Sequence, residues 1–267
     1  MTGKKAALFF DIDGTILSIS TLTVPESTIK ALKLARAKGH EIFINTGRTV
    51  CALPANIKCL PFDGFLCGCG SYLVYHDEVL LSASFPMERG YRYIDEMKKC
   101  NVEGLLEGEE DTYFSERVYR FEQLEAERRY AESLGLGRET TIEKKNFEYR
   151  KMLVCTDEKS DKERFFQVIS EDFAVIDRRN GAYECIQKQY SKATAIAYMQ
   201  HYLGFEKDQV YVFGDSGNDL AMFEYADHAV AMKVHDPMLD PYTEYVTDTV
   251  ENDGIYKALL HYGLIGS

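Results

Sequence analysis

The chain has 267 residues, of which 45% are hydrophobic and 28% charged, a composition typical of globular proteins that bury a core without disulfides or metals. Its formal net charge of −12 argues against nucleic acid as the main partner, because phosphate backbones are bound by clustered Lys and Arg. The same charge is compatible with a small phosphorylated ligand, since a local site can be positive within an acidic protein.

The first part of the chain alternates between short apolar runs and amphipathic segments. We predict strands at Ala6–Phe10, Glu41–Asn45 and Phe62–Leu66. Helical spacing over Pro25–Lys38, followed by Gly39, predicts a helix between the first two strands. Buried strands separated by helices predict a parallel sheet that is covered by helices.

The middle of the chain is more polar and differs in its pattern. Tyr72–Tyr75 and Val79–Ser82 flank His76-Asp77-Glu78 and predict a hairpin. From about Phe85 to Ile186 the sequence predicts an α+β module of its own. Its predicted helices are Met87–Cys100, Glu122–Leu134 and Asp161–Ile169, and its predicted strands lie near Val102–Leu106, Thr112–Ser115, Arg150–Cys155, Phe173–Asp177 and Tyr183–Ile186.

The alternating pattern returns after Lys188. The predicted helices here are Lys192–Leu203 and Asn218–Ala226, and the predicted strands are Val210–Phe213, Ala229–Met232 and Tyr245–Thr247. We therefore predict an α/β fold, with a Rossmann-like parallel sheet core covered by helices and an inserted α+β cap domain. The predicted core comprises residues 1–83 and 188–267, and the predicted inserted domain comprises residues 84–187.

Seven cysteines are scattered along the chain, and none forms a Cys-x-x-Cys pair. Cys67 and Cys69 lack a matching pair of His or Cys, so we interpret the cysteines as reduced thiols of a cytoplasmic protein rather than as a zinc site. No apolar run approaches the ~18 residues of a membrane span. The short apolar stretch near the N-terminus ends at Asp11, so we expect neither a signal peptide nor a membrane partner.

Carboxylates follow two of the predicted buried strands. Asp11-Ile12-Asp13-Gly14-Thr15 comes directly after the first strand, and Gly214–Asp219 comes after Val210–Phe213. Ligand sites in open parallel sheets lie beyond the carboxyl ends of the strands, so these acids are candidates for one shared site. Each motif alone is also compatible with an ordinary polar turn or a helix N-cap.

Two further positions complete the candidate site. Thr46 ends the second strand and offers a hydroxyl together with backbone N–H groups at a helix N-terminus, a natural phosphate holder. Lys192 stands at the start of its predicted helix, after Ser191. Carboxylates gather Mg²⁺, whereas Lys and helix N-termini neutralise a phosphoryl group. A spare carboxylate can then attack phosphorus or move a proton, so the combination predicts phosphoryl chemistry.

In these motifs the chain resembles the haloacid dehalogenase superfamily of phosphatases, and within it the Cof-like sugar-phosphatase branch with the larger α/β cap. The four ordered signatures are DIDGT (Asp11–Thr15), TGR (Thr46–Arg48), SK (Ser191–Lys192) and GDSGND (Gly214–Asp219). The resemblance spans essentially the whole chain. It implies Mg²⁺-dependent hydrolysis of small phosphorylated metabolites, such as sugar phosphates, through an aspartyl-phosphate intermediate.

The resemblance also implies a role for each matching residue. Asp11 would be the nucleophile and a metal ligand, and Asp13 would protonate the leaving oxygen and then activate water, while its carbonyl binds Mg²⁺. Asp215 would bind Mg²⁺ directly, and Asp219 would orient Lys192 or a metal-bound water. The residues expected to hold the substrate phosphate are Ile12, through its backbone, and Thr46, Gly47, Lys192 and Asn218.

Three positions depart from the usual pattern of the branch. Cys69-Gly70-Ser71 replaces Asn-Gly-Ala, Lys233-Val234-His235 replaces Gly-Asn-Ala, and Ala193 replaces Gly. We expect these positions to border the substrate site and to affect the choice of substrate rather than the chemistry. Lys233 and His235 are either contacts to the leaving group or parts of a solvated loop.

Two other functions stay open at this point. A phosphotransferase or phosphomutase of the phosphomannomutase type would use the same pair of aspartates, and it would transfer the phosphoryl group to a second sugar. An inactive metabolite-binding protein is the alternative that is not an enzyme, although it has no need of Asp11, Asp13, Lys192 and Asp215.

Overall fold

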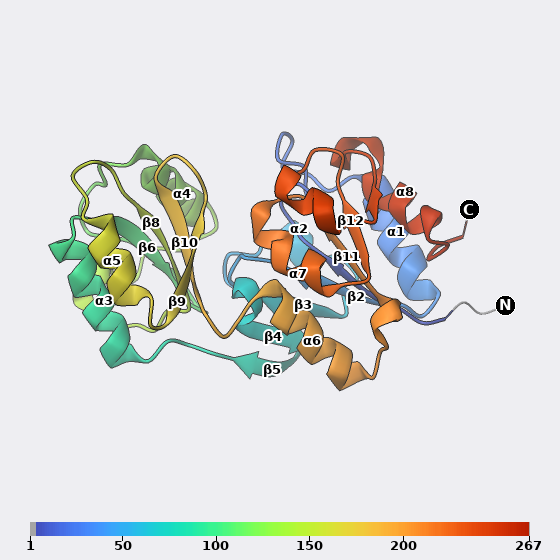
Figure 1. Ribbon diagram of the computed structural model, residues 1–267, viewed down its shortest axis with the longest axis horizontal. Helices are drawn as coiled ribbons and strands as arrows, with labels where there is room; N and C mark the ends of the chain where they lie inside the picture. The colour runs from blue at the N-terminus through green and yellow to red at the C-terminus, as the bar shows by residue number, and fades with distance from the viewer. Residues whose placement is uncertain (1–3, 267) are drawn as a thin grey trace. The chain divides into compact units, whose positions relative to one another are not determined.

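Residues 4–266 are described by the computed structural model, and over this range the backbone forms one eight-stranded and one five-stranded sheet (Figure 1). The eight-stranded sheet contains the strands predicted at both ends of the chain. Its order is β13 (Tyr245–Val246), β12 (His228–Ala231), β11 (Val210–Gly214), β1 (Ala7–Phe10), β2 (Glu41–Asn45), β3 (Gly64–Cys67), β4 (Tyr72–Tyr75) and β5 (Glu78–Ser82).

Neighbouring strands from β13 to β3 run parallel, which confirms the predicted Rossmann-like sheet. Strand β4 pairs antiparallel with β3 and extends the sheet at that edge. The turn between β4 and β5 places His76 and Asp77 at φ 45° and 65°. Positive φ at both central residues is typical of a two-residue hairpin turn, so the predicted hairpin is confirmed as well.

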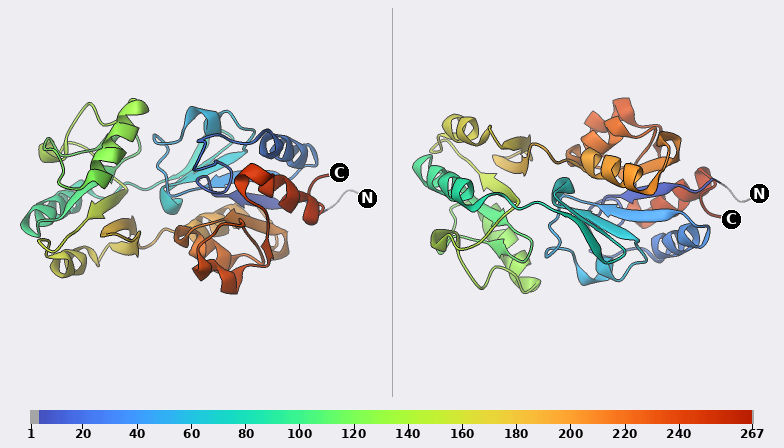
Figure 2. Two further views of the ribbon diagram at one scale, coloured as in Figure 1. Left: turned by 90° about the horizontal axis from the view of Figure 1, so that it is seen from above. Right: turned by 90° about the horizontal axis from the view of Figure 1, so that it is seen from below.

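The strands of this sheet carry apolar side chains on both faces, and helices therefore cover both faces. On one face Ala7 and Phe9 of β1 pack in a cluster with α6 (Lys192–Leu203) and α7 (Leu220–Tyr225). Figures 1 and 2 show α1 (Glu26–Ala37) and α8 (Gly254–His261) on the opposite face. Strand β1 is therefore buried on both sides, and its end is held at a fixed place.

The helices of this part differ from the prediction in two ways. Helix α8, which follows the left-handed Asp253, was not predicted, although its buried residues Ile255, Ala258 and Leu259 recur at helical spacing. The helix predicted at Asn218–Ala226 begins instead as a 3₁₀ turn, Gly217–Asp219, and α7 follows at Leu220. The side chain of Asp219 accepts the backbone N–H of Ser216, which shapes this turn.

The five-stranded sheet is formed by the middle of the chain, and its neighbouring strands pair antiparallel. Its order is β7 (Thr112–Tyr113), β6 (Glu103–Glu107), β8 (Lys151–Cys155), β10 (Ala182–Gln187) and β9 (Phe173–Asp177). Helices α3 (Met87–Lys99), α4 (Glu122–Ser133) and α5 (Lys162–Ile169) accompany it. The predicted α+β module is thus confirmed, with bounds that differ by one or two residues at most strands.

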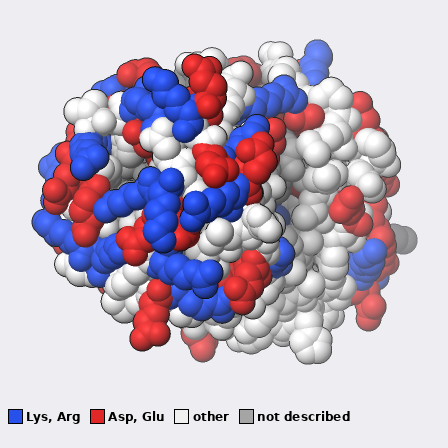
Figure 3. All heavy atoms as spheres, turned by 60° about the vertical axis from the view of Figure 1, so that its left-hand side comes forward, with Lys and Arg blue, Asp and Glu red and all other residues white. Residues whose placement is uncertain are grey.

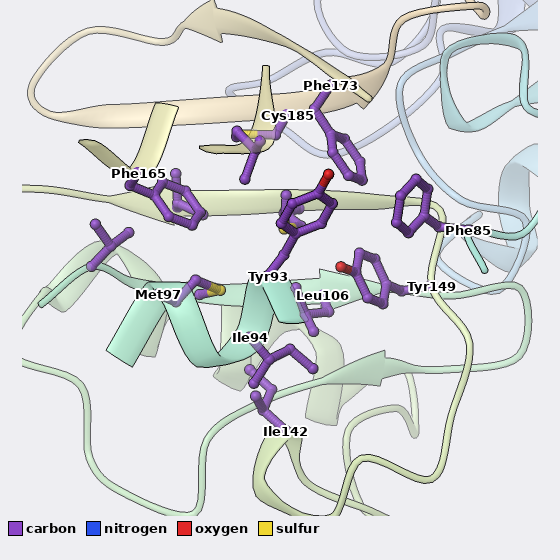
Figure 4. Packing of buried hydrophobic residues seen from close by; sticks show 14 of the residues in the cluster. Phe85, Tyr93, Ile94, Met97, Leu106, Ile142, Tyr149, Phe165, Phe173 and Cys185 are labelled. Atoms are coloured by element: carbon purple, nitrogen blue, oxygen red, sulfur yellow. The ribbon is translucent and has the colours of Figure 1, made fainter. Parts of the chain in front are cut away.

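The two faces of this sheet carry separate apolar clusters. Leu106 of β6 packs in one cluster with residues of α3 and α5, whereas Leu105 packs in another with residues of α4. Figure 4 shows the first cluster, in which Phe85 lies beside Tyr93 and Phe173 with ring centroids 5.7 and 4.9 Å away. Phe85 thereby ties the segment that precedes α3 to the core of the module.

By its internal contacts the chain divides into two units. The first unit runs up to Gly47, continues over Ala55–Leu81 and resumes at Ser191. The second unit comprises Arg48–Pro54 and Ser82–Tyr190, a range that contains the predicted inserted domain. The assignment of Arg48–Pro54 to the second unit was not predicted. Among the described residues, no helix has both the length and the hydropathy of a membrane span.

Charged side chains of both signs lie among one another on the face shown in Figure 3. Salt bridges such as Arg120 with Asp157, at 3.0 Å, and Lys145 with Asp95, at 2.6 Å, join neighbours of opposite charge in the second unit. This mixture differs from the one-signed basic surface that typifies a nucleic-acid-binding face.

Candidate active site

Asp11 and Asp215 follow neighbouring parallel strands, and this brings them to the same edge of the sheet. Asp11 comes directly after β1, and its backbone N–H donates to the carbonyl of Phe213 in β11 at 2.9 Å. This bond continues the ladder between the two strands by one residue. The side chain of Asp11 is buried, whereas that of Asp215 is half-buried.

The loop after Asp11 folds back upon itself and reaches Asp215. The carbonyl of Ile12 accepts the N–H groups of Thr15, Ile16 and Leu17 at 3.2, 3.0 and 2.9 Å. Gly14 has φ +86°, and a Cβ added there would lie 2.4 Å from Oδ2 of Asp215. The hydroxyl of Thr15 donates to Oδ1 of Asp215 at 2.8 Å. Thr15 was not predicted as a site residue, although it stands within the first motif.

Lys192 connects the carboxylates through buried hydrogen bonds. Ser191 caps α6 in a reciprocal capping box with Thr194, which fixes Lys192 as the first helical residue. Nζ of Lys192 lies 2.6 Å from Oδ1 of Asp11 and 2.5 Å from Oδ1 of Asp219. A third, longer bond of 3.3 Å runs to Oδ1 of Asn218. Lys192 itself is only 1% exposed.

Asp219 uses both of its oxygens in bonds to neighbouring groups. Oδ1 accepts from Lys192, and Oδ2 accepts the backbone N–H groups of Asp215 at 2.9 Å and Ser216 at 3.0 Å. One oxygen from each of Asp11, Asp215 and Asp219 lies within 4.8 Å of the others, so all three could surround a cation. Because both oxygens of Asp219 are engaged, Asp11 and Asp215 are better placed to bind a metal directly.

The electrostatics of this cluster favour an added positive charge. Burial raises the pKa of Asp11 to about 7, although Lys192 opposes this rise. Burial, followed by the charges of Asp11 and Asp219, raises the pKa of Asp215 to about 8. Burial alone would lower the pKa of Lys192, but its two carboxylate partners raise it above its usual value. The single positive charge of Lys192 does not balance the negative charges of the three carboxylates. Their hard oxygens form a donor set that fits a hard divalent cation.

Thr46 and Gly47 reach the same edge of the sheet by following β2, which pairs with β1. Thr46 is buried, its N–H donates to the carbonyl of Leu66 at 2.8 Å, and its carbonyl accepts from Cys69 at 3.0 Å. The predicted helix N-terminus at Thr46 is wrong, because α2 (Ala55–Lys58) begins only after Pro54. Any phosphate contact here would come from the Thr46 side chain or from loop N–H groups.

Asp13 lies two residues beyond Asp11 at the start of the returning loop. It is half-buried, forms an isolated bridge with Leu17, and its charge contributes to the raised pKa of Asp11. The charges of Asp11 and Asp13 therefore act on each other within one site.

His235 and Lys233 occupy a loop that supplies its own partners. Nδ1 of His235 lies 2.6 Å from the carbonyl of Met232, and Nε2 lies 2.9 Å from Asp240. Lys233 is exposed and lies 3.6 Å from Asp248. Of the two alternatives for these residues, the geometry favours a structural loop over contacts to a leaving group.

The chain is similar to known phosphatases over nearly its whole length. A model of the haloacid dehalogenase-like hydrolases matches residues 8–259. The 5-amino-6-(5-phospho-D-ribitylamino)uracil phosphatase YitU of Bacillus subtilis is 26% identical over 276 residues, which cover 98% of this chain and 99% of YitU. A Streptococcus pyogenes protein named for phosphatase and peptidyl-prolyl isomerase activities is 27% identical over 271 residues. The chain spans 55% of that protein's length.

Solved structures of similar fold match this chain over nearly its whole length. The subclass IIB sugar phosphatase BT4131 matches with a TM-score of 0.82 and 28% identity, over 98% of this chain and all of that one. The phosphatase BT1666 of Bacteroides thetaiotaomicron matches with a TM-score of 0.84 and 26% identity, over 98% of this chain and 96% of that one. With the family model extending over nearly its whole length, the chain belongs to the haloacid dehalogenase-like hydrolases and is a phosphatase of that family.

Proposed function

We propose that this phosphatase uses Mg²⁺ and hydrolyses small phosphorylated metabolites by way of a phosphorylated Asp11. The observation that carries the proposal is the bond of 2.6 Å between Nζ of Lys192 and Oδ1 of Asp11 in a buried setting. An ammonium group at this place favours the ionised form of Asp11, which is the form that attacks phosphorus. It also lies where it can neutralise the oxygens of a phosphoryl group bound to Asp11.

The reaction proceeds in two displacements. A carboxylate oxygen of Asp11 attacks phosphorus as the bond from phosphorus to the leaving oxygen breaks, and Asp13 gives its proton to that oxygen. Asp13 then takes a proton from a water molecule, which attacks the aspartyl phosphate and releases inorganic phosphate. Its place two residues from Asp11, in the loop that turns back at Ile12, supports this role.

The phosphate group would be held by residues from several strand ends. Lys192 and Asn218 already contact each other at 3.3 Å, and Thr46 and Gly47 follow the neighbouring strand. The backbone N–H of Ile12 completes the proposed set. Phosphoryl transfer requires positioning and charge compensation more than covalent chemistry from the protein, which suits a site built from strand ends and one buried lysine.

Asp11, Asp215 and the carbonyl of Asp13 are the proposed ligands of Mg²⁺. When bound, the ion would supply positive charge to the phosphoryl oxygens and would allow the neighbouring carboxylates of Asp11 and Asp215 to stay ionised together. Asp219 holds Lys192 instead, which agrees with its two engaged oxygens. Thr15 fixes one oxygen of Asp215 and leaves the other for the metal.

The proposed substrates are sugar phosphates or phosphorylated metabolites of similar size. The names of two similar proteins support this class, since BT4131 is a sugar phosphatase and YitU is a phosphatase of a phosphoribityl compound. We propose that the second unit serves as a cap that selects the leaving group, since the strand-end residues of the first unit would contact only the phosphoryl group. A cytoplasmic location accords with the seven cysteines, among which no disulfide is found within residues 4–266.

Release of inorganic phosphate from a panel of phosphorylated metabolites, with Mg²⁺ present, tests the proposal. We expect turnover of some hexose or pentose phosphates and none by the Asp11→Asn variant. A second sugar added to the assay distinguishes hydrolysis from transfer, because a phosphomutase would place the phosphoryl group on it. Turnover by Asp11→Asn at the wild-type rate would exclude the proposed nucleophile.

A further inference from the structure

Asn45, the last residue of β2, contacts the start of the helix that carries Lys192. Its side-chain Nδ2 donates to the carbonyl of Lys192 at 3.1 Å and lies 3.6 Å from the sulfur of Met222 in α7. Asn45 is fully buried. We infer that Asn45 is a positioning residue, which sets where the Lys192 ammonium stands relative to Asp11. The inference rests on the proposed function, in which Lys192 binds the phosphoryl group.

The amide of Asn45 is poorly explained as a contribution to folding. Its Oδ1 is buried and has no hydrogen-bond partner among the described residues. The orientation of the amide is fixed by its neighbour, because the carbonyl of Lys192 can only accept and must face the NH₂ group. A buried acceptor without a partner lowers stability, so an apolar side chain of the same shape would suit the core at least as well. The amide therefore serves the position of α6.

Asn45 belongs to a closed circuit of contacts, that is, a ring of contacts that leads back to Asn45. The circuit connects the two segments proposed to hold phosphate, Thr46-Gly47 and Lys192. Next to Asn45, the carbonyl of Thr46 accepts the N–H of Cys69 at 3.0 Å. Gly70 follows with φ +89°, and a Cβ there would lie 2.4 Å from the carbonyl of Ser191. The circuit closes through the bond from Asn45 to Lys192, the residue after Ser191.

The turn Cys69-Gly70-Ser71 takes part in this circuit through its backbone. The turn supports the backbone between Thr46 and Ser191, and both Cys69 and Ser71 are buried. Asn45 fixes the same junction from the side of the sheet. A shift of α6 by about 1 Å would move Nζ of Lys192 away from Asp11. Misplacement of a reacting or binding group by this distance is costly in catalysis.

Asn45→Leu tests the inference, because it keeps the branched shape and removes both the donor and the unpartnered acceptor. We expect kcat to fall about 10- to 100-fold, as for other residues that orient a binding side chain without contacting the ligand. The inhibition constant of inorganic phosphate should rise. The Mg²⁺ concentration for half-maximal activity should stay the same, because the hydrogen bonds of the Asn45 side chain run to Lys192 and Met222 and not to Asp11 or Asp215. The melting temperature should be equal to or above that of the wild type.

Thr28→Val is the matched control. The Thr28 hydroxyl is also buried without a partner, but it lies on α1 on the opposite face of the sheet, so kcat and phosphate inhibition should not change. Asn45→Ala provides a second variant if Asn45→Leu melts at a lower temperature. Wild-type kcat and phosphate inhibition in a folded Asn45 variant would overturn the inference.

Lys192→Met separates this inference from the proposed function. If Lys192→Met is impaired and folded Asn45 variants are not, Asn45 has no positioning role and the proposed site still holds. If Lys192→Met keeps wild-type activity, the proposed role of Lys192 fails together with the inference.

Discussion

Asp219 binds Lys192 at 2.5 Å in a place where neither side chain reaches solvent. We expect Asp219→Ala to lower the free energy of unfolding by about 3–5 kcal/mol, because it leaves a buried ammonium with one partner fewer. It also removes the acceptor of two backbone N–H groups. Urea denaturation measures the change.

A solvent-exposed pair offers the control for this prediction. Lys207 and Asp227 lie 3.4 Å apart with side chains 52% and 49% exposed, so Asp227→Ala should cost less than about 1 kcal/mol. Equal losses in the two variants would show that burial does not set the strength of the Lys192 pair.

Substitution of the two motif aspartates should have different kinetic signatures. Asp11→Asn should reduce turnover by at least ~10³-fold, because an amide neither attacks phosphorus nor binds Mg²⁺ well. Asp13→Asn should also be severe, yet it should allow some phosphoenzyme to accumulate, since the water that hydrolyses it is no longer activated. Mass spectrometry after rapid acid quench should find the added phosphate in the Asp13 variant and none in the Asp11 variant.

Removal of metal should abolish activity, and Mg²⁺ should restore it. Ca²⁺ should restore it poorly, because it accepts more ligands at longer distances and can engage both oxygens of Asp11. Mg²⁺ should also raise the melting temperature, as any ligand that binds the native state does. Full turnover in the presence of chelator would contradict the proposed ligand set of Asp11 and Asp215.

Thr15→Val should weaken the metal site without removing a ligand. The hydroxyl bond of 2.8 Å both orients Asp215 and favours its ionised form, opposing the burial that raises its pKa. We expect the Mg²⁺ concentration for half-maximal activity to rise about 10- to 100-fold, with kcat largely recovered at saturating Mg²⁺. The isosteric exchange Thr28→Val, remote from Asp215, should leave this concentration unchanged; a loss of kcat that Mg²⁺ does not reverse would speak against the assigned role.

The sequence predicted the parts of this structure that depend on local pattern. Apolar runs located β1 and β11, and the acids that follow them could be placed at one edge because parallel strands share that edge. Helix α8 was missed although its sequence carries the signal, since Ile255, Ala258 and Leu259 recur at helical spacing. The bonds of Thr15 and Asn45 could not be predicted, since they join residues far apart in the chain and depend on distances that only the packed sheet sets.

The burial of Lys192 also decides how the site responds to reactive compounds. An amine forms an imine with an aldehyde, or accepts an acyl group, only in its neutral form. Two carboxylates keep the buried Lys192 protonated, so its nitrogen has no free electron pair for either reaction. Many sugar phosphates carry an aldehyde or ketone in their open-chain form. In its proposed role, a lysine held in this way would bind the phosphate of such a compound at every turnover without being glycated by the carbonyl group.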